Sequence, residues 1–156
     1  MLMDLATQQG VKDLLVSVGD FIGDRMPCYR WPGKTAYSFS LREPTEEGRF
    51  TLRSYVTLYV HQEKRGTLLL TLAPRAVEVA TTAVKFFEQA VPSAAATPAS
   101  SWAPFQVEID SSSWPSMREY LAGLLEALVT GWKQRAAKEA EESDGGEDAS
   151  ATPEAS

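Results

Sequence analysis

The sequence predicts a single α+β domain, built as a two-layer sandwich in which helices cover one face of a mostly antiparallel four-stranded sheet. Four segments alternate apolar and polar residues, a pattern typical of strands with one buried and one solvated face. Three longer segments repeat apolar residues at helical spacing, and their stripes can cover the buried face of the sheet. The predicted element order is α-β-β-β-α-β-α.

The first helix is expected to begin at an N-cap, Asp4, and to end near Arg25. Its apolar residues form one stripe: Val11, Leu14, Leu15, Val18, Phe21 and Ile22. Residues 26–35 (MPCYRWPGKT) follow, and we expect a loop there because Pro27, Pro32 and Gly33 interrupt any regular element.

Three strands are expected next, over residues 36–42, 50–61 and 67–72, with a tight turn at residues 63–66. In the long strand one set of alternating residues is apolar and is predicted to face the core: Phe50, Leu52, Val56, Leu58 and Val60. The other set is predicted to lie on the uncovered face: Arg53, Tyr55, Thr57, Tyr59 and His61.

A second helix is expected over residues 75–91, after Pro74, and a loop over residues 92–104 leads to the fourth strand at 105–109. The last helix is marked by a capping-box pattern at Ser116 and Glu119. Its apolar stripe is continuous: Met117, Leu121, Leu124, Leu125, Leu128 and Trp132.

The acidic residues are concentrated at the C-terminus. Residues 1–136 carry 14 basic and 14 acidic side chains, whereas residues 137–156 carry one basic and seven acidic, which accounts for the whole net charge of −6. This segment has almost no bulky apolar residue, so we expect a domain over residues 1–136 and a disordered acidic tail over 137–156. A neutral domain has no electrostatic preference for a polyanion, and we do not expect nucleic acid as a partner.

The cellular compartment is also predicted from composition. A single cysteine, Cys28, excludes an intramolecular disulfide and fits a reducing compartment. No apolar run reaches membrane-spanning length, and the first residues lack the basic start and apolar stretch of a signal peptide. We therefore expect a cytoplasmic protein without a membrane partner.

Catalytic motifs are scarce in this chain. A Cys28–His61 pair would join a loop to the far end of a strand, and two such residues are too few for a zinc site. The GKT at residues 33–35 lacks the earlier glycine of a phosphate-binding loop. We predict no catalytic residue, cofactor or metal site, which favours a protein that is not an enzyme.

Two groups of residues have the composition of a binding surface, since aromatic residues and arginine dominate protein-binding hot spots. One group is Arg53, Tyr55 and Tyr59 on the uncovered face, and the other is Tyr29, Arg30 and Trp31 in the predicted loop. Two simpler interpretations stay open. Tyrosine also favours exposed strands for packing reasons alone, and Trp31 could pack against one end of the core.

The sequence therefore favours a non-enzymatic protein-binding or assembly protein, a chaperone-like adaptor that uses an uncovered sheet face or edge for a protein partner or for its own dimer. The element order is similar to that of small acidic secretion chaperones, which have two strands before the last helix where this chain has one. Phage tail-joining proteins have a similar small α+β layout. The alternative is a small-molecule-binding domain or enzyme with a pocket between sheet and helices near Tyr37, Trp31 and Trp102.

Overall fold

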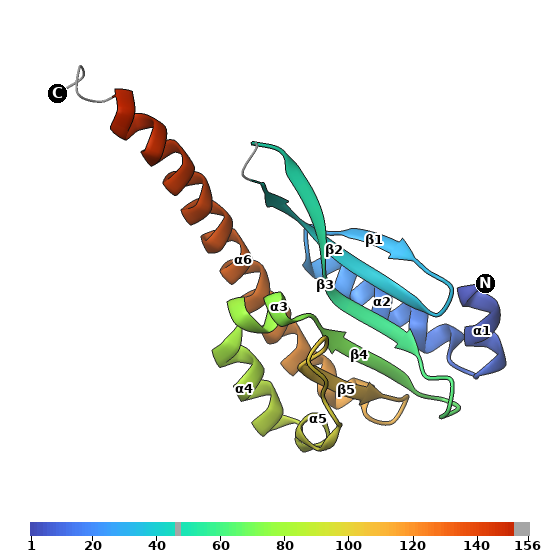
Figure 1. Cartoon of the computed structure of the whole chain (residues 1–156). Coiled ribbons are helices and arrows are strands. Elements are labelled where there is room, and N and C mark those ends of the chain that lie inside the picture. Colours follow the sequence, from blue (N-terminus) through green and yellow to red (C-terminus); the bar gives the residue numbers. More distant parts are fainter. Residues whose placement is uncertain (46–47, 152–156) are drawn as a thin grey trace.

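The computed structural model describes residues 1–45 and 48–151, and for residues 140–151 it describes the backbone alone. The predicted α+β class is confirmed, because an antiparallel sheet carries helices on one of its faces (Figure 1). In chain order the elements are α1 (Leu2–Gln8), α2 (Lys12–Arg25), β1 (Tyr29–Pro32), β2 (Ala36–Pro44), β3 (Phe50–Val60), β4 (Leu68–Leu72), α3 (Pro74–Val79), α4 (Thr81–Ala90), α5 (Pro92–Ala96), β5 (Phe105–Ile109) and α6 (Trp114–Ala151).

The sheet has five strands in the order β1-β2-β3-β4-β5, so the predicted number of four is wrong. The difference is β1, which lies in the segment predicted as a loop. Its residues pair with β2, with Tyr29 opposite Ser40 and Trp31 opposite Ser38. The strand is only four residues long and ends at Pro32, which is why alternation could not identify it.

The predicted first helix is two helices, because Gly10 adopts a φ of 71° that other residues rarely take. Hydrogen bonds fix the turn between α1 and α2 to the connection between β3 and β4. The Gly66 amide donates to the Gln9 carbonyl at 2.8 Å, and the Gln9 side-chain amide donates to the carbonyls of His61 and Gln62 at 3.1 and 2.8 Å.

The predicted second helix is also divided, into α3 and α4 at Ala80, and α5 occupies part of the predicted loop that follows. The last helix begins at Trp114, two residues before the predicted cap at Ser116. It continues as backbone helix to Ala151, through part of the predicted disordered tail. Residues 152–156 of that tail lie outside the described residues.

One core lies between the sheet and the helices. The register of β4 and β5 places one set of side chains toward the helices, and each is at most 1% exposed: Leu68, Leu70, Leu72, Phe105, Val107 and Ile109. The helices contribute matching buried stripes, among them Leu15, Val18 and Ile22 of α2 and Leu121, Leu125 and Leu128 of α6. In Figure 1, α2 and the first half of α6 lie behind the sheet. No helix in the described part of the chain is both long and apolar enough to cross a membrane.

A β-bulge divides β3 into two halves of opposite phase. Phe39 of β2 is opposite Val56, but the next residue, Ser40, is opposite Ser54, so Tyr55 is an extra residue in β3. Tyr55 and Val56 are consecutive, and both are fully buried. The alternation of inward and outward side chains therefore reverses at this point.

Beyond the bulge the sheet continues as a two-stranded arm, formed by residues 41–44 of β2 and 50–53 of β3. Neither β1 nor β4 extends alongside it, since β1 pairs only as far as Ser40 and β4 pairs with β3 only from Val56 onward. Figure 1 shows this arm projecting past the rest of the sheet. One side of the arm faces the helices, and the other side is open.

Candidate functional site

The open face of β1, β2 and β3 is the side of these strands opposite the helices. The register places residues from the three strands on it in rows across β2. Trp31 and Thr57 flank Ser38, and Tyr29 and Ser54 flank Ser40. Farther along, Leu52 lies opposite Arg42 and Phe50 opposite Pro44, so that the arm extends the same face.

Four large side chains on this face are exposed to solvent, and we call them the open-face patch: Tyr29, Trp31, Phe50 and Leu52. Trp31 is 73% exposed, Phe50 is 61% exposed, and the other two are each 52% exposed. Exposed apolar patches on folded proteins are often interaction sites, which makes this face the candidate site.

Three cations lie on β2 or in the turns at its ends, beside the open-face patch. The Arg42 guanidinium lies 4.3 Å from the centre of the Phe50 ring, and Lys34 and Arg49 lie in the turns at the two ends of β2. None of these three cations pairs with a carboxylate among the described residues. Glu46 and Glu47, between β2 and β3 in the sequence, lie outside those residues.

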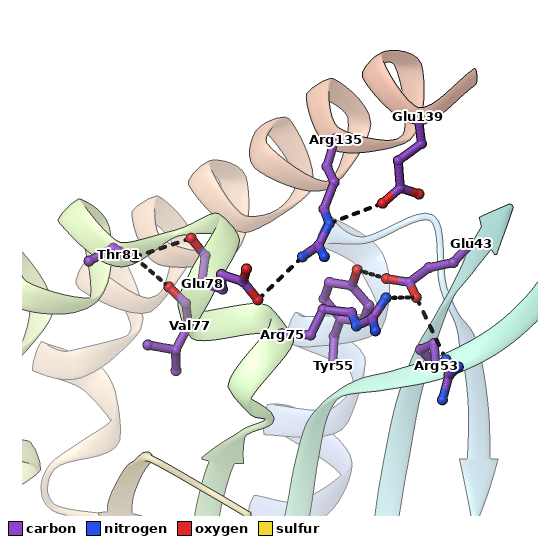
Figure 2. A network of polar contacts seen from close by, with 9 residues as sticks. All are labelled: Glu43, Arg53, Tyr55, Arg75, Val77, Glu78, Thr81, Arg135 and Glu139. Carbon is purple, nitrogen blue, oxygen red and sulfur yellow. Dashed lines mark hydrogen bonds and ion pairs between the residues drawn. The ribbon is translucent and has the colours of Figure 1, made fainter. Parts of the chain in front are cut away.

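Glu43, the residue that follows Arg42, lies on the helix side of the arm and is 5% exposed. Figure 2 shows how it is held. The Tyr55 hydroxyl and the Arg75 guanidinium of α3 both donate to it, and Arg53 Nε lies 3.7 Å from the same carboxylate. Burial, together with the negative charge of Glu43, raises the pKa of the Tyr55 hydroxyl well above its usual range.

The contacts of Glu43 anchor the arm to the helices, and helix α6 adds further contacts to this anchor. The Trp132 indole N–H donates to the Arg42 carbonyl of the arm at 2.9 Å. One turn later Arg135 pairs with Glu78 of α3 at 3.4 Å and with Glu139 at 3.3 Å. The arm is thus held from its helix side alone, which leaves the open-face patch exposed.

Because of the bulge, two of the predicted site residues lie on the opposite side of the sheet from the one predicted. Tyr55 is fully buried, and both Tyr55 and Arg53 lie on the helix side of β3 as part of the Glu43 cluster, so their predicted place on the uncovered face is wrong. Phe50 and Leu52, predicted as core, lie on the open face instead. Tyr59, beyond the bulge, is on the open face as predicted and is partly buried.

The other predicted group consists of three consecutive residues of β1, Tyr29, Arg30 and Trp31. Because side chains alternate along a strand, these residues do not all lie on the same face. Tyr29 and Trp31 are exposed on the open face, and Trp31 does not pack into the core. Arg30 lies on the helix side, where its guanidinium bonds Asp20 of α2 at 2.7 Å and stacks 4.4 Å from the Tyr37 ring centre.

Residues that the sequence pattern assigned to the core complete the patch. Phe50, Leu52 and Arg42 come together on the open face only because of the bulge. One signal was present in the sequence. Ser54 is polar but occupies a position that strict alternation from Phe50 to Val60 would assign to the core.

The alternative pocket near Tyr37, Trp31 and Trp102 does not form. Tyr37 is buried against α2, Trp31 lies on the opposite face, and Trp102 is 61% exposed in the segment before β5. The imidazole of His61 is also engaged, since Nδ1 accepts the amides of Glu63 and Lys64 and Nε2 lies 3.5 Å from Glu108. Within the described residues, no three His, Cys, Asp or Glu side chains cluster as a metal site would require.

Comparisons with protein-family models, with curated proteins and with solved structures found no match to this chain. The function must therefore be argued from the geometry of the chain.

Proposed function

We propose that this chain is a non-enzymatic protein-binding protein, an adaptor that recognises a protein partner through the open-face patch. The observation that carries the proposal is the exposure of Trp31, Phe50, Tyr29 and Leu52 on one face. At about 150–250 Å² for each aromatic side chain, they expose on the order of 450 Å² of apolar surface. That is the size of the largest patch on a typical monomer, and more than half of the ~800 Å² that each partner contributes to a standard interface.

The residue types on this face also support recognition of a protein partner. Tryptophan, tyrosine and arginine are the side chains that contribute most at protein interfaces, and here they surround small serines. Ser38 and Ser40, at the centre of the face, are flanked by Trp31 and Tyr29 of β1 on one side and by Thr57 and Ser54 of β3 on the other.

The test is quantitative copurification from the native cells with a matched control. In the test variant, Trp31→Ser and Phe50→Ser remove the two most exposed side chains of the patch. In the control, Phe86→Ser and Tyr120→Ser remove exposed aromatics of α4 and α6, which are 61% and 42% exposed and stack on each other.

We expect one or a few proteins to be lost from the test variant and retained by both the control and the parent chain. Circular dichroism should show that both variants remain folded, because all four positions are solvent-exposed. Sedimentation of the purified chain decides whether the partner is a second copy. Identical sets of copurified proteins from all three chains, together with identical masses, would contradict the proposed function.

A further inference from the structure

The open-face patch also indicates what kind of segment binds it. We propose that the bound segment is an acidic amphipathic helix of the partner protein; this inference rests on the proposed function. Its apolar stripe would lie on Tyr29, Trp31, Leu52 and Phe50, and its carboxylates would meet Arg42, Lys34 and Arg49.

The edge of the sheet is a poor template for an added strand. β1 is four residues long and ends at Pro32, which has no amide hydrogen to donate. Short strands and prolines are the features by which proteins protect their sheet edges from further pairing. These features disfavour an extended peptide added to the β1 edge, and we place the bound segment on the face of the strands instead.

The dimensions of the face fit a helix. β1 and β3 lie on either side of β2 at about 4.8 Å each, so the three strands present a face roughly 10 Å wide, which is close to the diameter of a helix. The apolar side chains cross it diagonally, from Trp31 and Tyr29 of β1 to Leu52 and Phe50 of β3. The rows from Ser38 to Pro44 extend about 20 Å at ~3.4 Å per residue, which a helix of about 14 residues covers. Ser38 and Ser40 are small enough to let its backbone approach β2.

The charges select an acidic segment. Arg42 lies within the face, and Lys34 and Arg49 lie at its two ends, each without a carboxylate partner among the described residues. Four other arginines, by contrast, are already paired within the fold: Arg30, Arg53, Arg75 and Arg135. A basic helix would bring like charges together at Arg42, whereas an acidic helix gains charge-assisted hydrogen bonds there.

Single-stranded nucleic acid also stacks on aromatic sheet faces, but it requires a continuous basic groove along its backbone. Here three cations surround the patch, and one of them, Arg42, is stacked on Phe50. A second copy docked face to face would bring the same cations together, and its acidic C-terminal segment has almost no bulky apolar residue to lie on the patch.

The test is selection from a displayed library of random 16-residue peptides on the immobilised full chain. We expect the enriched peptides to carry apolar residues at positions i, i+3 or i+4 and i+7, with excess aspartate and glutamate between them. Fluorescence anisotropy then gives affinities for labelled peptides, for charge-reversed versions and for a 16-nucleotide oligo(dT).

The chain variants make the test specific. Leu52→Ser should weaken the enriched peptides by about tenfold or more, and Arg42→Gln by several-fold with a smaller salt dependence, whereas Phe86→Ser should have no effect. Because the change removes two negative charges from the chain, Glu46→Gln with Glu47→Gln should preserve or raise the affinity for an acidic ligand.

Enriched peptides that are basic or alternate at period two would overturn the inference, as would the absence of enrichment, a loss of affinity in the Glu46–Glu47 variant or tighter binding of oligo(dT) than of the peptides. In any of these cases, the continued loss of a copurified protein from the Trp31–Phe50 variant would preserve the proposed function. If acidic peptides are enriched but bind the Leu52→Ser variant with unchanged affinity, the open-face patch is not their binding site.

Discussion

Tyr55 connects the bulge of β3 to the anchor of the arm. Its ring is fully buried, and its hydroxyl donates to Glu43, which Arg75 of α3 also holds. The extra residue of the bulge is therefore the one that points into the polar cluster. A buried carboxylate without such donors would be costly, because its desolvation is not compensated.

Replacing this hydroxyl tests the anchor. Tyr55→Phe keeps the ring but leaves Glu43 with one buried donor fewer, and we expect the free energy of unfolding to fall by about 1–2 kcal/mol at neutral pH. Urea denaturation measures the change. Tyr59→Phe, a partly buried tyrosine of the same strand on the open face, is the matched control and should change stability by less than about 0.5 kcal/mol.

The same substitution should alter the alkaline limit of stability. The pKa of folded Tyr55 lies above its usual value of 10.0, so folding favours the protonated phenol. Its contribution is complete below the pKa of the unfolded chain and is lost as the pH rises above about 10. The parent chain should lose stability faster than Tyr55→Phe above that pH. Parallel curves through pH 11 would show that the hydroxyl is not held by Glu43.

The crossing of α3 and α6 depends on a single glycine. A Cβ atom at Gly131 would lie 2.1 Å from the Val79 carbonyl oxygen, which is backbone and cannot turn aside. The two helices therefore meet in direct backbone contact at this point. The Trp132 hydrogen bond to the arm and the Arg135 pair to Glu78 follow within the next turn of α6, so the crossing also positions the anchor.

Two glycine substitutions on α6 should have opposite effects. Gly131→Ala forces the helices apart, and we expect it to lower the free energy of unfolding by at least about 2 kcal/mol. Gly123→Ala, where a Cβ meets no atom within 4 Å, should raise stability by up to ~1 kcal/mol because alanine favours the helix. Thermal unfolding compares them, and equal effects would contradict the close crossing.

Most elements of the fold follow from sequence periodicity, and the exceptions have local causes. The apolar stripes of α2 and α6 and the alternation of β4 and β5 were sufficient to predict which side chains of these four elements enter the core. The division of the first helix depends on the φ of Gly10, which a helical stripe does not reveal. β1 is too short to alternate visibly, and only its pairing with β2 makes it a strand.

The candidate site was less predictable than the core. Tyr29 and Trp31 were predicted by residue type alone, whereas Phe50 and Leu52 were assigned to the core. A bulge adds one residue and reverses every side chain before it, and no residue of this chain specifies it independently of the β2 partner. Ser54 in the apolar series was the one local indication.

At the scale of the whole molecule, the acidic segment continues helix α6. α6 continues as backbone helix to Ala151, whereas the sequence predicts a disordered tail over residues 137–156 because the segment has almost no bulky apolar side chain to bury. Deletion of residues 142–156 should shift the melting temperature by less than about 2 °C. Slow amide exchange anywhere in residues 143–151 would show instead that this part of α6 is stably ordered.

The proposed function requires that the open side of the arm, and not its helix side, contacts the partner protein. A photo-crosslinking scan along the β3 part of the arm tests this requirement directly. A photoreactive amino acid is placed singly at positions 50, 51, 52 and 53, and the chains are irradiated in the native cells. We predict that positions 50 and 52 capture the same partner protein and that positions 51 and 53, on the helix side, do not. Capture at 51 and 53 but not at 50 and 52, or at none of the four, would contradict the open-face patch as the recognition surface.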